Sequence, residues 1–267
     1  MGTSQASRGP SSGVPMVPPW VPDPILPDGQ NAPNPPQQLP LIAPSGRFGP
    51  SRSSLGRYAQ SGSSDDMRRG LGHYVGRGLG GASTAARRFG GTARTAGGLY
   101  GALSATASDR AAEQGSPLDP TLLRGRSASE VMDAVVEVVR PTDGTQDTEA
   151  SRRSIKDALS ELLNRFPNAD LLNLSEDQRL FAIERYVGFD IYARFRLDVG
   201  KAIQDKAPSA TAALARLKNI KEYIKEAVAR EFRQLHSSGQ SLNARHIVDL
   251  VNQTLYEAFH VFEDYNQ

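Results

Sequence analysis

The chain has 267 residues, a formal net charge of +2 at pH 7 and 38% hydrophobic residues. It contains no cysteine, which excludes disulfides, thiol catalysis and cysteine-ligated metal centres. No apolar run approaches the ~18 residues that a membrane-spanning helix needs, and no apolar stretch follows a charged start as in a secretory signal. We therefore expect a cytoplasmic protein without a membrane segment.

Charge is distributed unevenly along the chain. Residues 1–110 contain eleven arginines against five acidic residues, whereas residues 111–267 contain 20 basic and 24 acidic residues. The first lysine is Lys156. A GC-rich genome, which favours arginine codons, is one explanation. The other is chemical: amines are nucleophiles and the guanidinium group is not, so the α-amino group is the only reactive amine before Lys156.

Residues 1–46 form a tail rich in Pro, Gly, Ser and Gln. Because proline removes backbone donors and fixes φ, we expect this tail to be disordered or to adopt the polyproline II conformation. One apolar cluster in it contains the only tryptophan of the chain: Val17, Pro18, Pro19 and Trp20. Two interpretations stay open for this cluster. It binds an aromatic-lined groove, on a partner or on the protein's own body, or it belongs to an idle linker.

Residues 47–115 form a Gly/Arg-rich segment in which two short helices are expected. The first runs from residue 66 to about residue 78 and begins after Asp65, and a second, longer helix begins after Ser83 or Thr84. Each internal glycine costs roughly 1 kcal/mol relative to alanine, so neither helix is stable alone. Small residues four positions apart line one face of each helix: Gly72, Gly76 and Gly80, then Ala93, Gly97 and Gly101. Such a segment is expected to become ordered only against another surface.

From residue 116 onward the apolar residues follow the helical period of i, i+3 and i+4. Polar capping residues mark the expected helix starts: Ser127 with Glu130, Thr148 or Ser151, Ser175 with Gln178, and Asn243. The pattern predicts a bundle of four or five helices over residues 116–267. The predicted fold class is mostly α, with a disordered N-terminal tail, a Gly/Arg-rich middle segment and a C-terminal helical bundle.

Motifs that carry catalysis are missing from the sequence. The four histidines form no HExxH motif, and neither a P-loop nor a GxSxG sequence occurs. The glycine-rich stretch at residues 76–81 has no lysine and no preceding strand. The Asp65–Asp66 pair is more typical of a helix start than of a catalytic dyad. We therefore expect no catalytic residue, no metal site, no cofactor and no enzymatic activity.

Arginines alternate with aromatic residues in the Gly/Arg-rich segment. Arginine binds phosphates and aromatic rings stack on bases, so this segment is a candidate nucleic-acid interface. The alternative is that it binds an acidic surface, either of the helical region or of a partner protein. The candidate contact residues are the same in both cases: Arg68, Arg69, Arg77, Arg87, Arg88 and Arg94.

Gly2 follows the initiator methionine and is small enough for Met1 to be removed. The exposed α-amino group then has a pKa near ~7.7–8.0 and is a competent nucleophile at neutral pH. The myristoylation pattern fails because Ala6 stands where Ser or Thr is required.

Several stretches together resemble one known family. These are MGTS at the start, VPPW, RFGPSRSSLGRYAQSG, MRRGLGHYV and AARRFGGTARTAGGLY, followed by a helical C-terminal half. In this order they resemble the QatB family, accessory proteins of the four-gene Qat anti-phage defence systems of bacteria. The resemblance covers most of the chain and is strongest over residues 1–105.

The resemblance implies a set of partners and a role. The companions would be an ATPase (QatA), a QueC-like enzyme of the 7-deazaguanine type (QatC) and a TatD-like nuclease (QatD). QueC-like defence enzymes are associated with joining a deazaguanine to an N-terminal glycine, which implies that Gly2 is the acceptor. Two other hypotheses stay open, namely a nucleic-acid adaptor and a scaffold that forms homo-oligomers.

Overall fold

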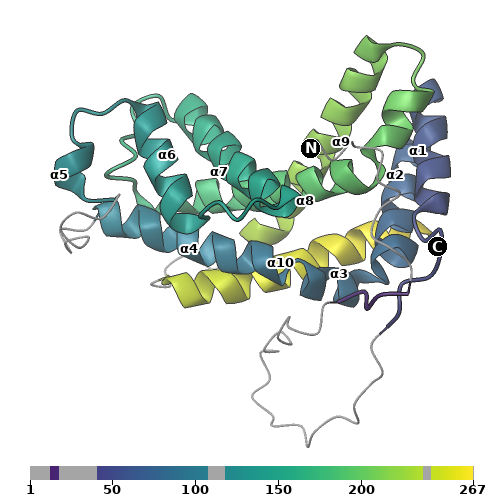
Figure 1. Ribbon diagram of the computed structural model, residues 1–267, viewed down its shortest axis with the longest axis horizontal. Helices are drawn as coiled ribbons and strands as arrows, with labels where there is room; N and C mark the ends of the chain where they lie inside the picture. The colour runs from purple at the N-terminus through teal and green to yellow at the C-terminus, as the bar shows by residue number, and fades with distance from the viewer. Residues whose placement is uncertain (1–12, 18–40, 108–117, 237–241, 267) are drawn as a thin grey trace, which may run out of the picture. The chain divides into compact units, whose positions relative to one another are not determined.

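The computed structural model describes residues 13–17, 41–107, 118–236 and 242–266. Within these ranges the chain is mostly helical and contains one isolated β-bridge (Figure 1), so the predicted mostly-α class is confirmed. The chain divides into two compact units, each assembled from distant parts of the sequence. Unit 1 comprises residues 1–90, 195–220 and 252–267, and unit 2 comprises residues 91–194 and 221–251. The division into 1–46, 47–115 and 116–267 stays a prediction.

The first two helices of unit 1 differ from the helix that the sequence predicted over residues 66–78. Helix α1 (Gly49–Ser61) was not predicted; it has a proline in its first turn, and Gly62 ends it with a φ of 78°. Helix α2 (Ser64–His73) continues as the π-helix η1 (Tyr74–Leu79). The expected cap at Asp65 was wrong, because Ser63 accepts the hydrogen bond from the Asp66 N–H. Aspartates in the first turn favour the helix through its dipole instead.

The second expected helix of the Gly/Arg-rich segment is two helices, α3 (Ala82–Arg88) and α4 (Gly90–Ala107). The caps expected at Ser83 and Thr84 were wrong. The free N–H of Ala82 donates to the carboxylate of Glu263 at 2.8 Å, so a residue distant in sequence caps α3. Phe89 interrupts the helix and is buried, with its ring centroid 5.0 Å from that of Phe259.

Unit 2 contains most of α4, the short helix α5 (Pro120–Leu123), α6 (Ala128–Val139), α7 (Gln146–Arg165) and the first part of α8 (Glu176–Lys206). The capping boxes predicted at Ser127 and Ser175 are both present. Helix α7 begins one turn before the expected Thr148, because the hydroxyl of Thr145 accepts the Thr148 N–H.

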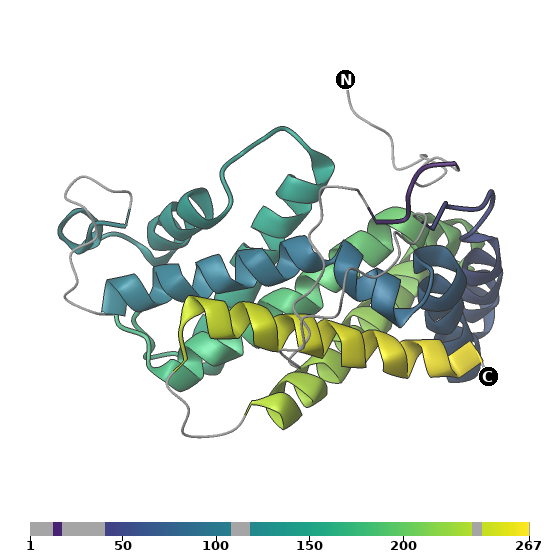
Figure 2. The ribbon, with the colours of Figure 1, turned by 90° about the horizontal axis from the view of Figure 1, so that it is seen from below.

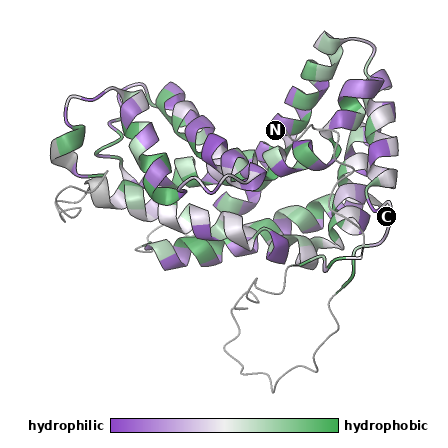
Figure 3. Cartoon of the chain, viewed as in Figure 1, coloured by the Kyte–Doolittle hydropathy of each residue, from purple (hydrophilic) through white to green (hydrophobic). Residues whose placement is uncertain are grey.

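Two further helices, α9 (Ala210–Leu235) and α10 (Ala244–Glu263), complete the described chain. Asn243 caps α10 as predicted, by accepting the N–H of His246. Figure 3 shows hydrophobic and hydrophilic residues on different sides of these helices. In unit 2, α4 lies beside the start of α10 (Figures 1 and 2), where the Gly97 backbone leaves no room for a larger side chain against Val248. The predicted small-residue face of α4 therefore packs on the protein itself.

Candidate functional site

Two segments of the proline-rich tail, residues 13–16 and residues 41–43, pair with each other in unit 1. Pro15 and Ile42 form an antiparallel bridge. The Met16 N–H donates to the Leu41 carbonyl at 2.8 Å, and the Ala43 N–H donates to the Val14 carbonyl at 2.9 Å. The bridge thereby holds residues 14–16 beside residues 41–43.

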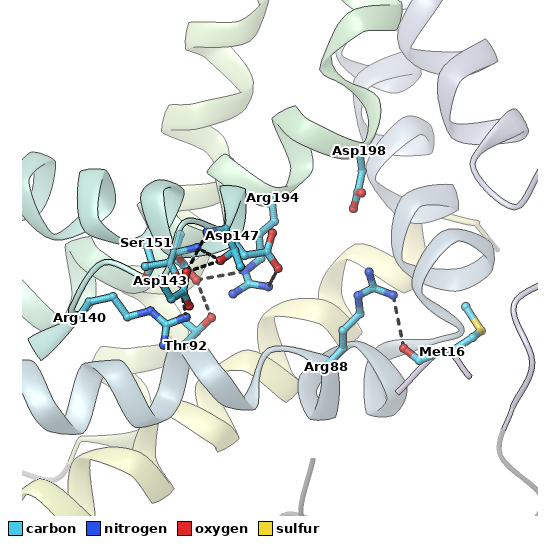
Figure 4. A network of polar contacts seen from close by, with 12 residues as sticks. Met16, Arg88, Thr92, Arg140, Asp143, Asp147, Ser151, Arg194 and Asp198 are labelled. Carbon is cyan, nitrogen blue, oxygen red and sulfur yellow. Dashed lines mark hydrogen bonds and ion pairs between the residues drawn. The ribbon is translucent and has the colours of Figure 1, made fainter. Parts of the chain in front are cut away.

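Met16 fixes these two bridged segments to the helices of unit 1. Its side chain is 2% exposed. A Cβ atom on Gly80 would lie 2.8 Å from the Met16 sulfur, and Gly80 has a φ of +83°, so both space and backbone conformation require glycine there. Arg88 donates from Nη1 to the Met16 carbonyl at 3.3 Å (Figure 4). The N-terminal segment is therefore anchored to α3 by a buried side chain and a charged donor.

The residues predicted to bind a partner lie next to this anchor in the sequence. Val17 directly follows Met16 and is half-buried. Pro18, Pro19, Trp20 and Gly2 lie outside the described residues. The structure thus places one end of the apolar cluster on unit 1.

The six candidate arginines differ in exposure and are divided between the two units. Arg68, Arg69 and Arg77 are exposed residues of unit 1, Arg87 and Arg88 are half-buried, and Arg94 is an exposed residue of unit 2. The guanidinium of Arg68 lies 5.9 Å from the centre of the Tyr265 ring. Only the exposed members have the accessibility that a contact with nucleic acid needs.

The charges of several arginines of unit 1 act together on the side chain of His73. Burial lowers its pKa, and the charges of Arg77, Arg57 and Arg69 lower it further. Arg57 also forms an ion pair with Asp66 at 2.9 Å. The charges of three arginines from α1, α2 and η1 therefore act on one imidazole.

A second arginine cluster in unit 1 was missed by sequence reasoning. Arg47 is 5% exposed, and none of its three guanidinium nitrogens has a hydrogen-bond partner in the described part of the chain. Its Cζ lies 4.9 Å from the centre of the Phe48 ring, and that of Arg52 lies 5.9 Å from it. The sequence RFGPSR contains both arginines, but no spacing rule predicts that they face one ring.

Unit 2 contains a buried polar network that connects α4, α7 and α8 (Figure 4). The Asp190 carboxylate accepts the Thr92 hydroxyl at 2.6 Å and pairs with Arg194 at 3.3 Å. Arg194 also pairs with Asp147 at 3.3 Å. Because these charges neutralise one another inside the bundle, they orient its helices.

Tyr186 belongs to the same helix and lies fully buried beside Ser151, with 2.9 Å between the two hydroxyl oxygens. Burial raises the pKa of Tyr186, and the negative charge of Asp190 raises it further. The phenol therefore stays protonated at neutral pH and serves as a hydrogen-bonding group. Sequence periodicity assigns such a residue to the core, but does not show which partner it has.

Two other kinds of site are absent from the described part of the chain. No group of three or more His, Cys, Asp or Glu side chains there is arranged to hold a metal ion. No helix within those same ranges has the length and apolar character needed to cross a bilayer.

The fold and these contacts define a class: a predominantly helical protein whose N-terminal segment forms a β-bridge with residue 42 and is held to the helices by Met16 and Arg88. Residues 80–262 match the family model described as "Qat anti-phage system associated protein QatB". This match spans well over half of the chain, so the chain belongs to the QatB family and is a component of the Qat anti-phage defence system. No curated protein and no solved structure matches it.

Proposed function

We propose that the chain is a non-enzymatic component of the Qat system and that its N-terminus accepts a deazaguanine-type group from the QueC-like partner QatC. The observation that carries this proposal is the Met16 anchor. It leaves residues 1–12 ahead of a fixed point on unit 1. No lysine amine competes before Lys156. The ATPase QatA and the nuclease QatD are proposed as further partners in the same system.

The proposed step is an amide formation in which the partner activates the carboxylate. ATP adenylates the carboxylate of the deazaguanine precursor on the QueC-like enzyme, and pyrophosphate leaves. The Gly2 amine then attacks the acyl carbon, so that an N–C bond forms, AMP leaves and the amine proton passes to a base of the partner. This chain supplies the nucleophile and the binding contacts.

The anchor limits how far the acceptor can reach. Gly2 lies eleven residue steps before Gly13, the first described residue, and an extended chain spans about 3.3–3.6 Å per step. The amine can therefore reach at most about 36–40 Å from Gly13. The partner's active site must come within this distance of unit 1, which favours a complex that binds beside the anchor.

Intact-mass analysis of the chain co-expressed with its QueC-like partner tests the proposal. We expect an adduct that tandem fragmentation assigns to Gly2. Gly2→Leu, which retains Met1, should show no adduct, whereas the control Arg69→Gln should be modified like the wild type. An unmodified wild-type chain beside a partner that is active on its own small-molecule substrate would overturn the proposal.

A second candidate function is nucleic-acid binding through the arginines around His73. It is favoured by the positive charge of Arg57, Arg69 and Arg77 at one place on unit 1. The expected signature is a binding constant that falls steeply as salt is raised. The double substitution Arg69→Gln/Arg77→Gln should reduce the slope of the salt dependence, and no gel shift at low salt would remove this candidate.

A further inference from the structure

Arg47 is a buried charge of unit 1 without a described hydrogen-bond acceptor. The side chain is 5% exposed, and its Nε, Nη1 and Nη2 atoms all lack a hydrogen-bond acceptor among the residues that the structure describes. A buried guanidinium without acceptors loses its hydration and gains no hydrogen bonds in exchange. Proteins retain such a group where an acceptor from outside the chain completes the site.

The surroundings of Arg47 are positive. The Arg88 charge lies close enough to act against protonation of Arg47, and Arg52 faces the same Phe48 ring. Asp198 is the carboxylate that acts in the opposite direction on Arg47. These four described residues, three arginines and one aspartate, together carry an excess of two positive charges.

The charge of Asp198 favours protonation of Arg47, but the two hydrogen bonds described for Asp198 come from other residues. Its carboxylate accepts the Tyr74 hydroxyl at 3.0 Å, and its backbone carbonyl accepts Arg52 Nη2 at 2.9 Å. The Tyr74 ring stacks on Phe48 with 5.7 Å between the centroids. These contacts hold Asp198 and Phe48 in place, and the donors of Arg47 stay without an acceptor among the described residues.

Arg88 connects this site to the anchored N-terminal segment. Figure 4 shows its side chain extending from α3 on the side on which the Asp198 carboxylate lies, with the Met16 carbonyl as its acceptor. Arg88 is only partly buried, so solvent reaches part of this residue. A guanidinium group has five donors, and one bond to a carbonyl leaves others for a ligand.

We propose that Arg47 and Arg88 form a binding site for a phosphate group. Two guanidinium groups offer the paired, planar donors that phosphate oxygens accept, and the dianion would cancel the excess of two positive charges. The phosphate is either free inorganic phosphate or the phosphate of a nucleotide. Because Arg88 holds both the anion and the Met16 carbonyl, the site lies at the base of the N-terminal segment.

The test is a titration of the full-length chain with inorganic phosphate, and separately with AMP, at constant ionic strength with sodium chloride as the reference. Binding is measured by calorimetry and by the shift in Tm. We expect saturable binding by the wild type and about a tenfold or greater loss of affinity in Arg47→Gln and in Arg88→Gln. The control Arg69→Gln, an exposed arginine of the neighbouring helix α2, should bind like the wild type.

The outcomes separate the sources of the phosphate and the competing explanations. Tighter binding of AMP than of phosphate identifies a nucleotide, and equal affinity identifies the free ion. No binding beyond the chloride reference, or equal binding by wild type and Arg47→Gln, overturns the proposal. Line broadening of the phosphate 31P signal, suppressed in Arg88→Gln, provides a readout if Arg47→Gln fails to fold. The inference does not rest on the Gly2 reaction, because phosphate binding is measured without the partner.

Discussion

Units 1 and 2 bury charge in opposite ways. In unit 2, Asp190 is paired with Arg194, and Lys225 lies 2.7 Å from the carboxylate of Glu161. Each of these buried groups has an opposite charge within contact distance. In unit 1, Arg47 is equally buried but has no hydrogen-bond acceptor in the described ranges, and Arg88 adds a like charge.

This difference separates structural charge from charge that awaits a ligand. A buried pair neutralises itself, so its removal is felt as a loss of stability. A buried guanidinium without an acceptor destabilises the protein until something negative arrives. Replacing Arg194 in unit 2 should therefore lower the stability of the protein, whereas replacing Arg47 in unit 1 should raise it.

The largest effect is expected for Arg194→Leu in unit 2. It leaves the Asp190 carboxylate, whose side chain is 1% exposed, without its cationic partner. Breaking a buried pair in this way costs about 3–5 kcal/mol. Urea unfolding followed by circular dichroism measures it, and the exposed control Arg153→Leu should change stability by less than about 0.5 kcal/mol. Equal stability of the two variants would show that the network carries no stability.

Adjacent glycines of α4 offer the next largest contrast. In Gly97→Ala the new Cβ would lie 2.6 Å from Val248 and 2.8 Å from the Ala244 carbonyl oxygen, so we expect a loss of about 1–3 kcal/mol. In Gly98→Ala the nearest atom lies 3.7 Å away, so the helix gains up to about 1 kcal/mol. Thermal unfolding of the two variants should move in opposite directions. A stabilised Gly97→Ala would contradict the close packing of α4 on α10.

Arg47→Met tests whether the buried charge in unit 1 destabilises the protein, in contrast to the paired charges of unit 2. It removes an uncompensated buried charge and keeps an apolar stem against Phe48, so we expect a gain of about 1 kcal/mol in phosphate-free buffer. Its control is Arg52→Met, which loses the hydrogen bond to the Asp198 carbonyl and should cost about 1 kcal/mol. If Arg47→Met is the less stable of the two, Arg47 is compensated within the protein.

The smallest effect concerns pH and His73. Burial and the charges of Arg77, Arg57 and Arg69 lower the pKa of His73 in the folded protein. The unfolded chain therefore binds a proton first, and stability falls as the pH drops below about 6.5 toward the folded-state pKa. His73→Gln should flatten the decline in stability between about pH 7 and pH 5, and Arg69→Gln should reduce it. An unchanged decline in both variants would refute this assignment.

Sequence patterns were reliable where short-range hydrogen bonds decide the structure. Ser127, Ser175 and Asn243 cap their helices as predicted, since an N-cap bonds a backbone N–H only two or three residues away. The patterns failed at the starts of α2 and α3. Ala82 is capped by Glu263, which lies far along the chain, and no local signal predicts such a partner.

The candidate site was predictable only in part. The arginine-rich composition directed attention to Arg88, but not to its bond with the Met16 carbonyl. Arg47 looks like any other arginine in the sequence, because its burial depends on residues as distant as Asp198. Gly2 stays a prediction from the sequence and the family resemblance.

By itself, the sequence determined the helical class, the helix caps at Ser127, Ser175 and Asn243 and the absence of cysteine, because each depends on neighbouring residues or on composition alone. Only the tertiary structure decided that the base of the proline-rich region is anchored and that Arg47 is buried without an acceptor. Both features arise where segments remote in sequence meet, and local patterns contain no information about which remote groups meet.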